Sequence, residues 1–245
     1  KAIALSQTDA VVFNNRGKAK STLGDLAGSL ADFDKAITLK PDYSKARLNR
    51  GTVRFGLNDF KGAAEDLDKI LATEGESAEL MRMLGLAKYN LKDNEAAKRF
   101  FEKAVKAGSK DSKVNLYLGY LRYDSKDFKG TIEALNAAEA GGEKEIALNE
   151  KRGKSLFETK DFTSCTTDLE KVVQNGQPDV VTFEDLGIAY MQQQKTKEGL
   201  TNLEKAVLAG SKNKDVYFQV GNGRFKDGNF AGAIEAYDKA ISWGA

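Results

Sequence analysis

Seven glycines recur at a strict interval of 34 residues along this chain of 245 residues. They are Gly17, Gly51, Gly85, Gly119, Gly153, Gly187 and Gly221. A fixed period of this kind is typical of proteins built from stacked copies of one supersecondary unit. Each copy contacts mainly its neighbours, so such a chain has extended surfaces instead of one central core. The interval therefore favours binding over catalysis.

Apolar residues keep helical spacing around these glycines. Twelve residues after most of the glycines lies a small side chain, sixteen residues after lies a large apolar one, and nineteen residues after lies another apolar one. In the first unit these residues are Ser29, Phe33 and Ala36. In six units an aspartate or asparagine lies eight residues after the glycine, where it is suited to cap a second helix. We therefore predict helix–turn–helix units, with first helices near 11–23, second helices near 27–39, and all others at steps of 34 residues.

We call the residues that recur at one position of the 34-residue repeat a column, and the seven glycines above the column glycines. Three further columns predict local structure. Glycines lie 23 residues after the column glycine at Gly108, Gly142, Gly176, Gly210 and Gly244, and we expect each to end a second helix in the left-handed conformation. Basic residues lie three after it at Lys20, Arg54, Lys88, Arg122 and Arg224. We expect their stems to cross the helix interface while their charges stay in water. Cys165 occupies the small-residue column and is expected to be a packing residue.

The chain resembles the tetratricopeptide repeat family over residues 10–245. Met83-Leu84-Gly85 and Phe183 to Tyr190 are similar to the first half of the family motif, and Gly24-Asp25 with Phe33, Ala36 and Pro41 is similar to the second half. The resemblance implies an all-α, right-handed superhelical solenoid of seven repeats. Their expected ranges are 10–43, 44–77, 78–111, 112–145, 146–179, 180–213 and 214–245.

The two ends of the chain are in phase with the repeat. Residues 1–9 match the end of a second helix, so we expect an orphan helix there, left from a truncated preceding repeat. Ile3, Leu5, Ile241 and Trp243 lie where further repeats would cover them. Solenoids normally need polar capping elements, so we expect a segment of a longer protein whose uncapped ends are prone to self-association.

Composition narrows the functional classes. There are 38 basic and 36 acidic residues, no histidine and one cysteine. This balance argues against nucleic-acid binding, and no apolar run is long enough to insert in a membrane. We find no nucleophile–base pair, metal cluster or phosphate loop, so we predict no catalytic residue, no metal and no cofactor. One cysteine fits the cytoplasm slightly better than the periplasm or an organelle lumen, and leaves both open.

In proteins that this chain resembles, the first helices line a concave groove that accepts peptides. Positions of that groove are expected to hold polar contacts at Asn15, Asn49 and Arg82, and apolar contacts at Tyr89, Leu116, Tyr117, Tyr120 and Tyr123. The set of basic residues and asparagines by which some relatives bind a chaperone carboxylate does not fit any window of this chain.

Four functions are open to a repeat chain of this kind. The leading hypothesis is a protein–protein interaction scaffold that binds a partner peptide or extended segment. The alternatives are a self-assembling scaffold and the regulatory or targeting part of an enzyme whose catalytic domain lies outside this segment. A helical-repeat RNA binder is opposed by the balanced charge.

Overall fold

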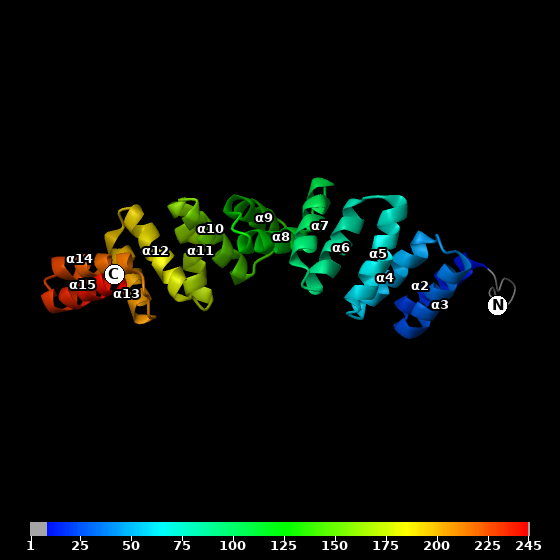
Figure 1. The fold of residues 1–245 in the computed structure, drawn as a ribbon, viewed down its shortest axis with the longest axis horizontal. Coiled ribbons are helices and arrows are strands. Elements are labelled where there is room, and N and C mark those ends of the chain that lie inside the picture. Colours follow the sequence, from blue (N-terminus) through cyan, green and yellow to red (C-terminus); the bar gives the residue numbers. More distant parts are fainter. Residues whose placement is uncertain (1–8, 245) are drawn as a thin grey trace. The chain divides into compact units, whose positions relative to one another are not determined.

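The computed structural model describes residues 9–244, which form fourteen α-helices and no β-strand (Figure 1). The first helices are α2 (Ala10–Thr22), α4 (Ser44–Gly56), α6 (Ala78–Asn90), α8 (Ser112–Asp124), α10 (Ile146–Glu158), α12 (Val180–Gln192) and α14 (Lys214–Lys226). The second helices are α3 (Leu26–Leu39), α5 (Phe60–Glu74), α7 (Asn94–Lys106), α9 (Phe128–Ala140), α11 (Phe162–Asn175), α13 (Thr196–Leu208) and α15 (Phe230–Gly244). The predicted helix–turn–helix array is confirmed, and every described helix begins one residue before its predicted first residue. The predicted orphan helix lies outside the described residues, apart from Asp9, which caps α2.

The chain divides into two compact units, residues 1–114 and 115–245. Within each unit, a first helix packs against the second helix of its own repeat, and that second helix packs against the first helix of the next repeat. First helices of neighbouring repeats also touch, α2 with α4 in the first unit and α10 with α12 in the second. Packing is therefore local along the sequence, as a repeat architecture requires.

The column glycines lie where the two helices of a repeat approach most closely. In six repeats, a methyl group added to the glycine would come within 2.8 Å of the large apolar side chain sixteen residues later. Gly119 faces Leu135 in this way, and Gly85 faces Phe101. Gly51 is the exception, because the nearest atom to an added methyl group is the Cβ of Asp66 at 3.5 Å. The period therefore reflects close helix packing in all repeats except the second.

The turn between the two helices has the same backbone in every repeat. One residue in each turn has a φ between +60° and +85°: Gly24, Asn58, Lys92, Lys126, Lys160, Gln194 and Gly228. The following aspartate then accepts a hydrogen bond from a backbone N–H three residues on, as Asp59 does from Gly62 at 2.9 Å. Five aspartates and Asn229 cap second helices in this way, which confirms that prediction. Lys195 occupies the cap of α13 and makes no such bond.

The ends of the second helices follow the prediction only in part. Gly108, Gly142 and Gly210 have φ values of +90°, +103° and +88°, as expected. Gly176 instead has a φ of −119°, because the chain leaves α11 directly in an extended conformation ahead of Pro178. Gly244 is the last residue of α15 and does not lie beyond it. The prediction was wrong for these two glycines.

Four members of the basic column, Lys20, Arg54, Arg122 and Arg224, donate to carbonyl oxygens of the protein, so the expectation that their charges stay in water was wrong for these four. Arg54 donates to the carbonyl oxygen of Gly62 at 3.2 Å and to Asp66 at 3.0 Å. Arg122 and Arg224 donate to the carbonyl oxygens of Gly130 and Gly232, both at 3.1 Å. Glycine makes room first for the capping Asp59 and then for this contact, since a methyl group at Gly62 would come closest to the Asp59 carboxylate and would lie 3.0 Å from the Cδ of Arg54. These side chains therefore join the first helix to the opening turn of its partner.

Three repeats contain an Arg–Asp pair with a buried aspartate that the sequence analysis missed. The pairs are Arg16 with Asp32, Arg50 with Asp66, and Arg152 with Asp168. Their Nε–Oδ2 distances are 2.7, 2.9 and 2.6 Å, and each guanidinium donates twice to its carboxylate. The signal was present, because arginine directly precedes the column glycine and aspartate lies sixteen residues later only in these repeats.

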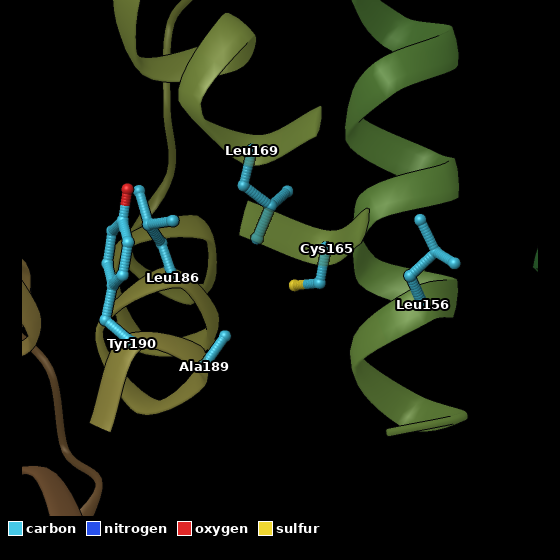
Figure 2. Packing of buried hydrophobic residues seen from close by; sticks show 6 residues of the cluster. All are labelled: Leu156, Cys165, Leu169, Leu186, Ala189 and Tyr190. Atoms are coloured by element: carbon cyan, nitrogen blue, oxygen red, sulfur yellow. The ribbon is translucent and has the colours of Figure 1, made fainter. Parts of the chain in front are cut away.

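Cys165 lies in a core cluster of the second unit (Figure 2). Leu156 of α10 lies on one side of it, Leu169 is one helical turn away on α11, and Leu186 and Ala189 of α12 lie on the other side. The thiol is fully buried, and burial raises its pKa to about 12. A thiol held neutral and away from solvent is a packing group, so the predicted burial of Cys165 is confirmed.

Candidate protein-interaction surface

The residues predicted to bind a partner lie on first helices of both units. Asn15, Asn49, Arg82 and Tyr89 belong to α2, α4 and α6 of the first unit. Leu116, Tyr117, Tyr120 and Tyr123 all belong to α8 and lie in the second unit. Each set is therefore described within its own unit.

The asparagines of the first unit are joined in a short hydrogen-bonded row. The side-chain amide of Asn49 donates to the Oδ1 of the buried Asn14 at 2.8 Å. Asn14 in turn donates to the Oδ1 of Asn15 at 3.3 Å. Asn15 is exposed, whereas Asn49 is half-buried and uses one donor inside the protein. Asn15 is therefore the more accessible of the two predicted polar contacts.

The other two residues of the first unit also have internal partners. Arg82 makes a bidentate pair with Glu79, at 2.8 and 2.6 Å, and lies 3.5 Å from Asp111. The hydrogen bond to Glu79 raises the pKa of the guanidinium further. The Tyr89 ring packs 6.3 Å from that of Phe101, and the ammonium of Lys92 lies 6.0 Å from the Tyr89 centroid. Binding a partner through Arg82 would compete with an existing ion pair.

Leu116 does not lie on an accessible surface, and this corrects its expected place in the groove. It is 1% exposed and packs in a core cluster with Leu135, Ala138 and Leu148. The residue that lies three before the column glycine thus faces the second helix of its own repeat here. Tyr120, one turn later, packs against the edge of the same cluster and is half-buried.

The three tyrosines Tyr117, Tyr120 and Tyr123, here named the tyrosine face, are all half-buried on α8. The phenol of Tyr120 donates to the Oε2 of Glu145 at 3.0 Å. The ammonium of Lys151, from α10, lies 5.5 Å from the Tyr120 centroid and 4.5 Å from the Tyr123 centroid. A cation over aromatic rings holds their orientation. Burial raises the pKa of Tyr123, so its phenol stays neutral.

The aromatic column to which Tyr123 belongs also has a packing role. Tyr123 meets Phe128 edge-on, with ring centroids 6.4 Å apart, and Phe55 meets Phe60 in the same way at 5.1 Å. The pairs in the fifth and seventh repeats repeat this geometry. Tyr123 therefore fixes the opening of α9 while one side of its ring remains accessible.

A cavity of about 350 Å³ adjoins the tyrosine face within the second unit. We name it the Asp185 cavity, and it is lined by Tyr123, Asp124, Lys126, Phe128, Lys154, Glu158, Val181 and Asp185. The residues come from α8, α10, α12 and the turn into α9. Tyr123 was among the predicted anchors, and Lys154, Glu158 and Asp185 lie at groove positions on the first helices of the fifth and sixth repeats.

Within residues 9–244, no three His, Cys, Asp or Glu side chains are grouped so that they could hold a metal ion. None of the helices in the described part of the chain has both the length and the apolar character needed to cross a membrane.

Comparison with known proteins identifies the type of repeat. Models of the tetratricopeptide repeat match residues 14–79 and 184–245, and a second such model matches residues 78–108. No curated protein sequence matches the chain. Proteins of this repeat type generally mediate protein–protein interaction, and their fold is typically a non-catalytic scaffold.

Three solved structures illustrate the similarity in fold. YrrB, a tetratricopeptide repeat protein with an unusual peptide-binding site, has a TM-score of 0.52 and 20% identity, over 86% of this chain and 91% of its own. MamA from Desulfovibrio magneticus RS-1 has a TM-score of 0.52 and 18% identity, over 69% and 96%. PilF of Pseudomonas aeruginosa has a TM-score of 0.50 and 16% identity, over 82% and 93%.

These identities establish a shared fold and nothing about shared partners. The helix pairs recur every 34 residues, and in six repeats a glycine lies where the two helices approach most closely. Models with a single family description match more than half of the sequence. This chain belongs to the tetratricopeptide repeat family.

Proposed function

We propose that this protein is an interaction scaffold that binds an extended segment of a partner protein along its first helices. The tyrosine face is the observation that carries the proposal. Tyr117, Tyr120 and Tyr123 lie one helical turn or less apart on α8, and Lys151 holds two of the rings in place. Aromatic side chains that are already ordered lose little entropy when they bind, which is why interfaces favour them.

The first unit would supply polar contacts to the same kind of segment. Asn15 is exposed and has its amide nitrogen available, and a carboxamide can both donate to and accept from a peptide backbone. Asn49, Arg82 and Tyr89 lie on the equivalent helices and already have partners. We therefore assign them a smaller contribution than Tyr120 and Tyr123. The similarity in fold to YrrB, which has a peptide-binding site, fits this assignment.

A selection from a randomised library of extended peptides, displayed on phage, would test the proposal. The affinity of a selected peptide is then measured for the wild type and for Tyr120→Ala. Truncation of an aromatic contact typically costs about 2 kcal/mol, so we expect binding to weaken roughly 30-fold. Leu208→Ala is the control, because Leu208 is 86% exposed on α13, a second helix.

Tyr120 also packs against the core, so folding must be measured on the same variant. We expect urea denaturation to show a small loss of stability together with the loss of affinity. A large loss of stability with unchanged affinity of the folded protein would show that the tyrosines only pack. Failure to select any peptide would count against the proposed groove as a whole.

A second candidate function, self-assembly, is favoured by the exposed apolar side chains of α15. Ile241 is 71% exposed, Ile234 61%, Phe230 58% and Trp243 44%. We infer that this surface can pair with another copy of the chain. Sedimentation velocity at increasing concentration should show association that Ile241→Ser together with Trp243→Ser abolishes. A monomer at all concentrations would exclude it. Ile3 and Leu5, the other predicted contacts, lie outside the described residues.

A further inference from the structure

The Asp185 cavity, of about 350 Å³, is lined in part by apolar side chains. Tyr123 and Phe128 form an edge-on ring pair on one side, and Val181, which is 46% exposed, adds an aliphatic surface. Such walls suit the methylene stem of a long side chain whose polar end lies deeper or farther along the cavity.

Two of the five charged side chains around the cavity, Lys154 and Asp124, are already paired within the protein. The ammonium of Lys154 lies 2.7 Å from the Oε1 of Glu150 and 2.9 Å from the Oδ2 of Asp179. Asp124 is 3.4 Å from the ammonium of Lys151. Lys154 therefore has little capacity left for a negatively charged ligand, because two carboxylates already neutralise it.

Asp185 differs from these groups. Among the described residues, neither Asp185 nor Glu158 makes a hydrogen bond or an ion pair. The pKa of Asp185 is raised to about 7, mainly by burial and in smaller part by the carboxylates of Glu158, Glu184 and Asp179, against the opposing effect of Lys154. A half-buried carboxylate beside another carboxylate is stabilised by an incoming positive charge.

We propose that the Asp185 cavity binds a lysine or arginine side chain of the partner segment, and that Asp185 pairs with its cation. The stem would lie against Tyr123, Phe128 and Val181. Charge complementarity selects this occupant: an acidic side chain would meet Asp185 and Glu158, and a neutral apolar one would leave Asp185 without a partner. The inference rests on the proposed function and adds the chemistry of one residue of the partner.

The proposal fixes the sign of a pH dependence. A cation binds the ionised form of Asp185, so affinity should rise as pH rises through about 7 and become constant above it. The titratable and charged groups around Asp185 are Tyr123 and Asp124 from α8, Lys126 from the turn before α9, Lys154 and Glu158 from α10, Cys165 from α11, and Asp179 and Glu184 at the start of α12. Lys154 and Asp179 keep their charges throughout, since the pKa of Lys154 is raised and that of Asp179 is lowered.

The direct test uses small probes and does not depend on peptide binding. N-acetyl-lysine N-methylamide is titrated into the 15N-labelled protein, with N-acetyl-norleucine N-methylamide as the uncharged control. We expect the lysine probe to shift amide resonances of α10 and α12 in a saturable manner, and the norleucine probe to bind more weakly. Binding of the lysine probe should fall by about 30-fold between pH 8 and pH 5.5, as a single linked proton requires.

Asp185→Asn is the decisive variant, because it keeps the shape of the side chain and removes only its charge. We expect it to weaken the lysine probe by about 30-fold or more at pH 8, within the range of one charge-assisted hydrogen bond, and to flatten the pH dependence. Asp238→Asn on α15 is the control, since Asp238 is exposed and distant in sequence. Circular dichroism checks that both variants remain folded.

Each outcome separates this inference from the proposed function. If selected peptides bind but lack a preferred Lys or Arg, and Asp185→Asn changes nothing, the cavity assignment is wrong and the peptide-binding function stands. If no peptide binds but the lysine probe binds in an Asp185-dependent way, the cavity stands and the groove does not. Absence of any shift around α10 and α12 at saturating probe overturns the assignment.

Discussion

The second and fourth repeats begin their helices at equivalent residues but differ in the chemistry of the contact between the two helices. In the second repeat, Arg50 and Asp66 form a buried ion pair beside Gly51. In the fourth, the same positions are Leu118 and Ala134, and Leu135 presses closely on Gly119. Both pairs of helices begin at equivalent residues. The 34-residue period therefore specifies where the helices run, while the contacts between them vary freely in polarity.

The comparison also shows that the ion pair depends on several specific partners, whereas the apolar contact does not. Asp66 lies 2% exposed and accepts from both Arg50 and Arg54. Arg50 reaches Asp34 in the preceding repeat as well, at 2.6 Å. A buried charge of this kind must remain fully paired, whereas Leu118 only needs to be covered. The ion pair is thus more sensitive to single changes than the apolar contact that replaces it.

Asp66→Ala should have the largest effect, because it leaves two guanidinium groups without their main partner in a buried place. We expect a loss of about 3–5 kcal/mol in the free energy of unfolding, measured by urea denaturation. The matched control is Arg50→Leu with Asp66→Ala, which copies the fourth repeat. That double variant should recover most of the loss. A double variant as unstable as the single one would contradict the view that the two chemistries are interchangeable.

Gly119→Ala should destabilise the fourth repeat by overpacking. The added methyl group would lie 2.6 Å from the Cγ of Leu135, a branched carbon that cannot move aside without moving the side chain. We expect a loss of about 1–3 kcal/mol by thermal or urea denaturation. Recovery in Gly119→Ala with Leu135→Ala would identify Leu135 as the cause. An unchanged midpoint in the single variant would refute close packing at this glycine.

Gly51→Ala should have the opposite sign. The nearest atom to the new methyl group is 3.5 Å away, an ordinary van der Waals distance, and the glycine lies inside α4. Replacing glycine by alanine in a helix interior stabilises it by about 0.5–1 kcal/mol. We therefore expect a higher denaturation midpoint. Destabilisation similar to that of Gly119→Ala would show that the two repeats pack alike.

Lys126→Gly tests the turn of the fourth repeat against that of the second. Lys126 has a φ of +60° and Asn58 a φ of +62°. Asparagine tolerates this conformation better than lysine does, so we expect glycine to stabilise the fourth repeat by about 0.5 kcal/mol. Asn58→Gly should change stability less. Equal gains at both positions would mean that the side chain adds no strain.

The repeat period was sufficient to predict every described helix to within one residue at its start. The reason is physical: glycine, aspartate and large apolar residues each perform one task at one position of the repeat. Leu116 and the basic column were misjudged, because a residue's exposure depends on which neighbour covers it in that particular repeat. Leu116 is covered by Leu135 and Leu148, and Arg54 finds the carbonyl of Gly62.

The candidate site was less predictable than the fold. Tyr120 and Tyr123 could be found because aromatic residues stand out in a groove position. Asp185 could not be identified as special, since its properties come from burial and from the use of Lys154 by Glu150 and Asp179. Such pairings differ from repeat to repeat and need the three-dimensional arrangement.

The arginines that precede the column glycine have a consequence for how the array unfolds. Arg50 bonds to Asp66 in its own repeat and to Asp34 in the repeat before it, and Arg152 likewise bonds to Asp168 and to Asn136 and Glu139. In a linear array, stability is the sum of a term for each repeat and a coupling term between neighbours. These arginines raise the coupling between the first and second repeats and between the fourth and fifth. Hydrogen exchange should therefore find that the members of each pair open together, as cooperative blocks larger than one repeat.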